Sequence, residues 1–124
     1  MLKIEFISFG FKHSPAIEAE FVFDFRSLPN PFYVEELRDK TGLDEEIRAF
    51  IMQAKESKEY FERLVCLIDF LISLYEKEGK ESLKIALGCT GGQHRSVAFA
   101  EILNEHFKEK GHLCSVFHRD INQR

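Results

Sequence analysis

The hydrophobic residues in the first quarter of the chain follow the two-residue period of β-strands. Residues 2–11 are rich in β-branched and aromatic side chains and reach a glycine near their end, which predicts a strand. Residues 19–31 predict a second strand with one face of phenylalanines and an opposite face that carries Asp24 and Arg26. Two prolines should stop this strand, because a proline nitrogen cannot donate to a ladder.

The middle of the chain changes to the three- and four-residue spacing of amphipathic helices. Residues 34–40 predict a short helical turn, and Asp44 is the expected N-cap of the helix that follows. Ser57 is expected to cap a longer helix whose apolar residues repeat as far as Tyr75. Gly79 should end that helix, because glycine readily adopts the left-handed conformation of a C-terminal cap.

The last third predicts a buried strand, a helix and a final strand. Residues 83–88 are almost all apolar, as expected of a strand buried on both faces. Residues 96–110 are the predicted helix, ended by Gly111, and residues 113–118 the last strand. The order β, β, α, α, β, α, β predicts an α/β fold, with residues 1–124 as a single layered domain and a mostly parallel central sheet flanked by helices.

Composition excludes several classes of function. The chain has 124 residues, 44% hydrophobic and 31% charged, which suits one domain with its own core. A net charge of −4 gives no electrostatic reason to expect a nucleic acid partner. The amino terminus lacks a signal-peptide pattern, and no apolar stretch is long enough to span a membrane. The three cysteines lack disulfide-framework or zinc spacing, so we expect a reducing cytoplasm, no metal and no cofactor.

The segment between the buried strand and the last helix, Cys89-Thr90-Gly91-Gly92-Gln93-His94-Arg95-Ser96, predicts an anion-binding loop. Parallel sheets bind ligands beyond the carboxyl ends of their strands. The glycines allow close approach to the backbone, and the first turn of the helix offers unpaired N–H groups with a partial positive charge. The histidine, arginine and hydroxyl side chains add donors, and Arg95 can hold phosphate in a bidentate manner. The alternative is a tight turn with solvated polar side chains.

Cys89 and Arg95 admit a second chemistry, because five residues separate them. Protein tyrosine phosphatases and rhodanese-like enzymes have this spacing, with a thiolate that attacks and an arginine that grips the oxyanion. The opposing interpretation is that Cys89 is a small apolar residue at the end of a buried strand. We favour the latter, because a chain without tryptophan cannot carry the Trp-Pro-Asp general-acid segment of those phosphatases.

Four motifs resemble, in their order along the chain, those of one known family. They are FISFGFKHSPAIEAEFVFDFRSLPNPF, LRDKTGLDEEIRAFI, IALGCTGGQHRSVAFAEIL and FHRD. Together they extend from about residue 4 to residue 120 and resemble the C-terminal domain of RapZ, the bacterial RNase adapter family. Full-length members begin with a P-loop domain carrying a Walker A sequence, which this chain lacks. The resemblance therefore implies a stand-alone version of the second domain or a fragment of a larger protein.

The resemblance implies a metabolite sensor and not a catalyst. In this family the C-terminal domain is similar in fold to part of phosphofructokinase, and in enterobacterial members it binds glucosamine 6-phosphate, a small regulatory RNA and protein partners. The ligand-facing residues that it implies here are Asp24, Arg26, Thr90, Gly91, Gly92, His94, Arg95, Ser96 and His13. Asp24 would suit a sugar hydroxyl or an ammonium group, with an Asp24–Arg26 ion pair as the alternative. His13 and His118 are also candidates for structural roles, and we favour that role for His118.

Two departures from the family pattern change what is expected of this chain. Gln93 stands where a lysine is usual, which removes one cation from the anion site. The tail INQR lacks the lysine-rich ending linked with RNA binding in enterobacterial members, and the net charge of −4 also argues against RNA. Glu105 and Glu109 also dilute the remaining basic residues, so RNA is not the expected partner. Those residues are Lys108, Lys110, His112, Arg119 and Arg124. The resemblance further implies a homo-oligomer and a protein partner, for which the sequence shows no contact surface.

Overall fold

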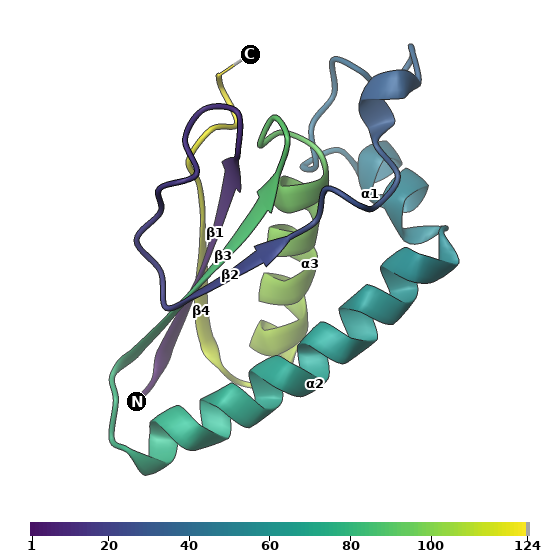
Figure 1. Cartoon of the computed structure of the whole chain (residues 1–124). Helices are drawn as coiled ribbons and strands as arrows, with labels where there is room; N and C mark the ends of the chain where they lie inside the picture. Colours follow the sequence, from purple (N-terminus) through teal and green to yellow (C-terminus); the bar gives the residue numbers. More distant parts are fainter. Residues whose placement is uncertain (124) are drawn as a thin grey trace.

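The computed structural model describes residues 1–123, and its centre is a four-stranded sheet in which every pair of neighbours is parallel (Figure 1). The strands are β1 (Lys3–Gly10), β2 (Phe21–Asp24), β3 (Ser82–Cys89) and β4 (Leu113–His118). Their order across the sheet is β2-β3-β1-β4. The α/β fold and the parallel sheet predicted from the sequence are confirmed.

Parallel register brings the carboxyl ends of the strands to one edge of the sheet. At that edge Gly10 is paired with Cys89, and Asp24 with Gly88. Figure 1 shows that the loops after β1 and β3 and the carboxyl-terminal tail meet at this end of the molecule. Ligands of parallel sheets bind at such an edge.

Three α-helices pack on one face of the sheet, namely α1 (Glu45–Met52), α2 (Lys55–Lys77) and α3 (Arg95–Glu109). The crossovers from β2 to β3 and from β3 to β4 advance in the same direction, so right-handed connections place all three helices on the same side. Alternate residues of the strands form the core with these helices. The largest fully buried side chains are Phe6, Phe9, Phe25, Phe99, Phe107, Ile4, Ile47, Ile51, Ile68, Leu83, Ile85 and Leu87.

The connection between β1 and β2 approaches the opposite face of the sheet. The Phe11 ring packs edge-on against Phe9, with ring centroids 4.7 Å apart. Gly88 lies beneath both rings, and a Cβ atom there would come within 2.5 Å of each. Glycine is therefore required at this strand position by the close approach of the aromatic rings.

Two elements differ from the prediction: the second strand is shorter, and the predicted helical turn is not a regular helix. The strand predicted over residues 19–31 is only β2, because the chain turns into the core at Phe25, whose side chain is fully buried. Tyr60 also caps the strand end, where its hydroxyl donates to the Asp24 carbonyl at 2.7 Å. The helical turn predicted at residues 34–40 is a series of hydrogen-bonded turns, preceded by the short 3-10 helix η1 (Pro31–Tyr33).

Helix ends follow the predictions except at the start of α2. Asp44 is the N-cap residue of α1, but its carboxylate accepts from the upstream Thr41 N–H at 2.9 Å. The prediction that Ser57 caps α2 is wrong, because the helix begins at Lys55 and places Ser57, fully buried, in its first turn. Gly79 and Gly111 follow α2 and α3 with φ angles of +70° and +91°, as expected of helix terminators.

Candidate functional site

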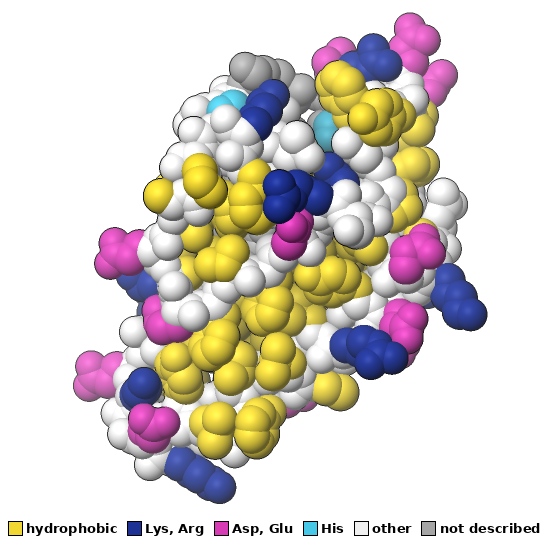
Figure 2. All heavy atoms as spheres, viewed as in Figure 1, with side chains coloured by type: hydrophobic (Ala, Val, Ile, Leu, Met, Phe, Trp, Pro, Cys, Tyr) yellow, Lys and Arg dark blue, Asp and Glu magenta, His cyan; other side chains and the backbone are white. Residues whose placement is uncertain are grey.

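A pocket of about 420 Å³ opens at the carboxyl edge of the sheet, where β3 leads into α3. Its floor comes from the predicted anion loop, and its rim comes from the segments that follow β1 and β2. The lining residues are Lys12, Asn30, Phe32, Tyr33, Arg38, Asp39, Cys89, Thr90, Gly91, Gln93, His94 and Arg95. Three of these side chains are cationic and one is anionic, so the pocket is locally positive although the chain carries −4. Figure 2 shows basic and histidine side chains at this end and apolar side chains over β2 and α2.

Arg95, the first residue of α3, is buried at the floor of the pocket with an exposed fraction of 4%. One terminal nitrogen donates to the carbonyls of Arg26 at 2.7 Å and Leu28 at 3.1 Å. The other donates to the Thr90 hydroxyl at 3.3 Å, whereas the buried Nε–H has no acceptor among residues 1–123. Among residues 1–123 no carboxylate forms an ion pair with Arg95. A buried cation of this kind, beside the unpaired N–H groups of a helix start, favours an anion.

The loop backbone lies directly against the end of β1. Gly92 has a φ of +76°, and a Cβ atom on it would lie 2.6 Å from the Gly10 nitrogen. A Cβ atom on Gly10 would in turn lie 2.5 Å from the Gly91 carbonyl carbon, whereas Gly91 itself has open space around it. Gly10 and Gly92 are thus required by contacts within the protein, and Gly91 is the glycine that leaves room for a ligand.

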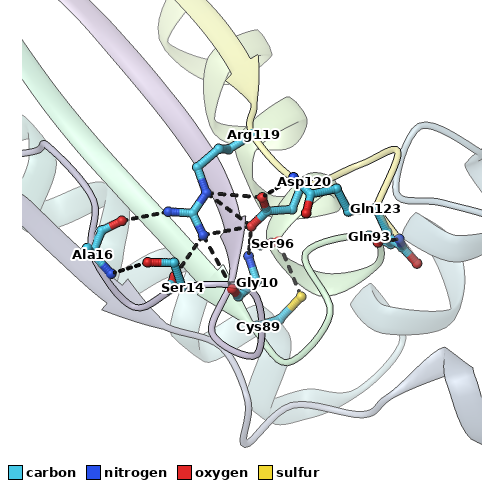
Figure 3. Close-up of polar contacts among 9 residues, drawn as sticks. All are labelled: Gly10, Ser14, Ala16, Cys89, Gln93, Ser96, Arg119, Asp120 and Gln123. Carbon is cyan, nitrogen blue, oxygen red and sulfur yellow. Dashed lines mark hydrogen bonds and ion pairs between the residues drawn. The ribbon is translucent and has the colours of Figure 1, made fainter.

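A buried carboxylate, which sequence reasoning missed, supports this loop from behind (Figure 3). Asp120, 1% exposed, accepts from the Gly10 N–H at 2.7 Å and from the Arg119 guanidinium at 2.8 Å. Burial raises the pKa of Asp120, but hydrogen bonds from Arg119 and the Gly10 N–H outweigh burial, so the pKa lies below its usual value. Arg119 also donates to the carbonyls of Ala16 at 2.6 Å and Ser14 at 2.7 Å. The motif FHRD therefore ties the segment after β1 to the anion loop.

The segment before α1 fixes the other side of the loop. The Gly42 N–H donates to the Gln93 carbonyl at 2.8 Å. A Cβ atom on Gly42 would lie 2.2 Å from the Ala98 nitrogen, in the first turns of α3. The His94 ring is held as well, because its Nε2 lies 3.1 Å from the Arg38 carbonyl. Residue 42 is therefore glycine because its segment packs against the start of α3, a contact that the sequence alone does not show.

Cys89 and Ser96 meet beneath the pocket. The Cys89 sulfur lies 3.2 Å from the Ser96 hydroxyl, which is fully buried (Figure 3). Cys89 lines the pocket but is only 2% exposed, whereas Ser96 does not line it. The pair that the phosphatase alternative requires, Cys89 and Arg95, is therefore present at the pocket floor.

The predicted residues of the strand end do not line the pocket. Asp24 and Arg26 form an exposed ion pair with 2.7 Å between carboxylate oxygen and guanidinium nitrogen. Hydrogen bonding from Arg26, aided by the charges of Arg26 and Arg95, lowers the pKa of Asp24 below its usual value. The Arg26 guanidinium also lies 3.9 Å from the centroid of the Phe11 ring. This geometry is that of the ion-pair alternative.

The other predicted histidines and the basic residues of the carboxyl terminus also lie outside the pocket lining. The buried Nε2 atom of His13 has no hydrogen-bond partner in the part of the chain that the structure describes. His118 lies between the Ser8 hydroxyl at 2.6 Å and the Glu101 carboxylate at 2.7 Å, as expected of a structural histidine. Lys110 pairs with Asp69 at 3.0 Å. Arg124 lies outside the described residues.

Half of the residues that line the pocket were not predicted from the sequence, including every lining residue between β2 and α1. The missed residues are Lys12, Asn30, Phe32, Tyr33, Arg38 and Asp39. The exposed aromatic pair in NPFY, which stands outside any hydrophobic period, was the available signal. Within residues 1–123 no helix combines the length and apolar character needed to cross a membrane.

Comparison with known proteins gives consistent relationships over nearly the whole chain. A family model described as the RapZ C-terminal domain matches residues 2–122. Nucleotide-binding proteins of Bacillus pumilus and Bacillus velezensis are 48% and 50% identical over 121 residues, which cover 98% of this chain and 41% of each relative. A nucleotide-binding protein of Caldicellulosiruptor saccharolyticus is 50% identical over 120 residues, 97% of this chain and 41% of the relative. The chain thus spans about two fifths of the length of these curated relatives.

Proposed function

This chain belongs to the RapZ C-terminal domain family, and from that premise we propose that it is a regulatory domain that binds a phosphorylated small molecule in the pocket between β3 and α3. The names of the relatives support a phosphorylated ligand in general, since those proteins are called nucleotide-binding proteins. The chain carries residues of only one part of such proteins, so the proposal concerns this pocket and not the activity of a whole relative.

The observation that carries the proposal is the buried Arg95 at the start of α3. Its guanidinium has backbone carbonyls and one hydroxyl as partners, and no carboxylate within the described residues neutralises it. A phosphate placed above Gly91 would meet the helix N–H groups and this charge together. We therefore assign phosphate binding to Arg95, the Thr90 hydroxyl and the backbone of Gly91, with His94 at the side, whereas the predicted Gly92 packs against Gly10 and does not line the pocket.

The proposed ligand is an amino-sugar phosphate such as glucosamine 6-phosphate. The family resemblance supports this choice, and the pocket volume of about 420 Å³ is within the range of small-molecule sites. Asp24 and Arg26 would take part only if their ion pair opened, because both point outside the pocket lining in the described structure. His13 and Ser96 would act indirectly, through the loops that they support.

A thermal-shift titration tests the proposal. Glucosamine 6-phosphate, glucose 6-phosphate, glucosamine and inorganic phosphate would be titrated into the wild type and into Arg95→Lys. A ligand at ~100 times its dissociation constant adds ~2.7 kcal/mol to the free energy of unfolding, which is readily seen as a raised midpoint. We expect phosphorylated ligands to raise the midpoint of the wild type and to lose most of that effect in Arg95→Lys. Equal shifts in both proteins, or none in the wild type, would refute the assignment.

A cysteine-dependent phosphatase is the second candidate, because Cys89 lines the pocket beside Arg95 and contacts Ser96. Its weakness is the 2% exposure of Cys89, which leaves little room for attack on a phosphoryl group. Release of inorganic phosphate from sugar phosphates by the wild type, abolished in Cys89→Ser, would establish this candidate. Unchanged ligand binding by Cys89→Ser, together with no wild-type turnover, would eliminate it.

The proposed location of the protein rests on its cysteines, and its proposed partners rest on the family. We infer a cytoplasmic protein, since Cys66, Cys89 and Cys114 are all unpaired thiols. A homo-oligomer and a protein partner remain proposals that rest on the family alone. RNA binding is disfavoured by the net charge of −4, and only a titration with a steep salt dependence would restore it.

A further inference from the structure

A second hollow lies at an edge of the sheet, between strand β2 and helix α2, and its lining residues differ from those of the anion pocket. Phe23 lines it from the strand, and Tyr60, Leu64 and Leu67 line it from the helix. Its volume is about 430 Å³. Figure 2 shows the apolar side chains gathered over these two elements. We call this hollow the edge groove.

Helix α2 has a wider apolar face than the four strands cover. One stripe of this face, which includes Leu64, is buried in the core. A neighbouring stripe contains Tyr60, Leu67 and Leu74, which are seven residues apart and therefore lie along one side of the helix. Leu67 is 41% exposed, and Phe70, three residues further on, is 60% exposed. A strand placed beyond β2 would cover this second stripe.

Strand β2 has an open edge next to the exposed stripe. The order β2-β3-β1-β4 gives β2 a partner on one side, and no strand of residues 1–123 pairs with its other side. The backbone N–H and C=O groups of an open edge are available to an added strand. The Tyr60 hydroxyl donates to the Asp24 carbonyl at 2.7 Å and so holds α2 beside the end of β2. At the opposite edge, His118 of β4 contacts Glu101 of α3 at 2.7 Å, so α3 already covers the helix side there.

The length and the charge of the edge groove indicate what would fill it. Helix α2 rises about 17 Å from Glu56 to Leu67, which is the length of about five residues of extended chain. Arg63 forms an ion pair with Glu59 at 2.9 Å. Glu56 also lines the groove but forms no ion pair with any residue of the described chain. The groove therefore suits a short, mainly apolar segment that carries a basic side chain.

We propose that the edge groove binds an extended segment of another protein, which adds to β2 as a fifth strand of the sheet. The backbone of the segment hydrogen-bonds to the open edge of β2, and its alternate apolar side chains cover Phe23, Tyr60 and Leu67. A lysine or arginine of the segment lies beside Glu56. A strand fits this site better than a helix, because only a strand pairs with the open backbone groups of β2. The interaction is independent of the anion pocket.

Selection from a random peptide library provides the probe. Heptapeptides displayed on phage would be selected on the immobilised wild type and counter-selected on Leu67→Asp. We expect enrichment of peptides with apolar residues at alternate positions and at least one lysine or arginine. No enrichment, or enrichment of peptides without this alternation, would overturn the proposal.

Fluorescence anisotropy with the selected peptide, made synthetically and labelled, tests how it binds. Leu67→Asp should weaken the peptide at least about 10-fold, and Glu56→Lys should weaken it about 3- to 10-fold. Leu113→Asp is the matched control, because Leu113 is 50% exposed on β4 at the opposite edge, and it should bind the peptide as the wild type does. N-methylation of alternate peptide amides should abolish binding in one register and preserve it in the other, because only every second amide of a strand faces its neighbour.

Three results would overturn the proposal. Equal affinity of the peptide for the wild type and for folded Leu67→Asp would place it outside the edge groove, and Glu56→Lys decides the same question if urea denaturation shows Leu67→Asp to be unfolded. Equal effects of the two N-methylation patterns would exclude strand addition. Sedimentation velocity tests for a second copy of this chain: self-association of the wild type that Leu67→Asp or Glu56→Lys abolishes would make that copy the occupant.

Discussion

At the scale of single residues, the anion loop is held in one conformation by contacts of its side chains and of its backbone. Arg95 is confined by the carbonyls of Arg26 and Leu28, and Gly92 by the nitrogen of Gly10. Because these contacts are made within the protein itself, folding sets the conformation of the loop. The loop therefore acts as a preformed site, which is what tight recognition of a small anion requires.

Gly92→Ala should destabilise the protein by at least about 2 kcal/mol, because a Cβ atom there combines a left-handed backbone with overpacking. The φ angle is +76°, and the new atom would lie 2.6 Å from the Gly10 nitrogen. Urea denaturation would measure the loss. Gly91→Ala is the control, since nothing lies within 4 Å of its Cβ position, and it should change the free energy of unfolding little. Equal losses in the two variants would contradict the described loop.

Asp120→Asn should destabilise the protein by about 3 kcal/mol at neutral pH, because it leaves the buried Arg119 contact and the Gly10 N–H with a neutral partner. The Asp120 pKa is lowered from 3.8 in the folded state, so its contribution is complete above that value and is lost as the pH falls through the folded pKa. Urea denaturation from pH 7 to pH 3 should therefore show the two proteins converging only at acid pH.

The exposed carboxylate Asp24 provides the control for this pH dependence. Its pKa is lowered as well, but its side chain is 48% exposed and its ion pair with Arg26 is solvated. Asp24→Asn should change the free energy of unfolding far less than Asp120→Asn at every pH. A difference between wild type and Asp120→Asn that stayed constant down to pH 3 would show that the ionised carboxylate is not the cause.

At the scale of elements, α2 offers the clearest test of how a helix begins. Ser57→Ala should leave the free energy of unfolding within about 0.5 kcal/mol or raise it, because the buried hydroxyl has no hydrogen-bond partner among the described residues. An N-cap serine would instead cost about 1 kcal/mol. Asp44→Ala, at the N-cap position of α1, should lose about 0.5–1 kcal/mol in the same urea experiment, because it removes the hydrogen bond from the Thr41 N–H and the negative charge at the helix start. A comparable loss in Ser57→Ala would restore the cap interpretation.

Hydrophobic patterns predicted most elements well because the helices bury one face and the central strand β3 buries both of its faces. The last strand was predicted at its observed bounds, and β3 and α3 within one residue at each end. Strand β2 was overestimated because hydrogen bonding to β3 ends with the Phe25 N–H, which donates to the Gly88 carbonyl at 2.8 Å, whereas the prediction extended the strand to residue 31. Periodicity reports which face a side chain occupies, and it carries no information about where a ladder ends.

The site was only partly predictable for a different reason. The loop at residues 89–96 can be recognised from its own glycines and hydrogen-bond donors. Four of its predicted ligand residues line the pocket, namely Thr90, Gly91, His94 and Arg95. Lys12, Phe32 and Arg38 reach the pocket through the parallel register and the turns after β2, which no local pattern encodes. Asp24 ends strand β2 at the same edge, yet it pairs with Arg26 and does not line the pocket.

At the scale of the whole molecule, charge is distributed unevenly. The chain carries −4, whereas the pocket is lined by Lys12, Arg38 and Arg95 against the single carboxylate of Asp39. A small anion can respond to this local field, but an extended polyanion would also meet the acidic surface. The balance therefore favours a metabolite in the pocket over a nucleic acid on the surface.

The central claim is that a phosphorylated ligand binds at the start of α3, and a nuclear magnetic resonance titration tests it most directly. Inorganic phosphate and glucosamine 6-phosphate would be added to ¹⁵N-labelled protein while backbone amides and the Arg95 Nε–H signal are followed. We predict saturable shifts concentrated in residues 90–97 and at Arg95 Nε with both ligands, extended to residues 30–38 only by the sugar phosphate. Saturable shifts centred elsewhere, or none at millimolar ligand, would contradict the account.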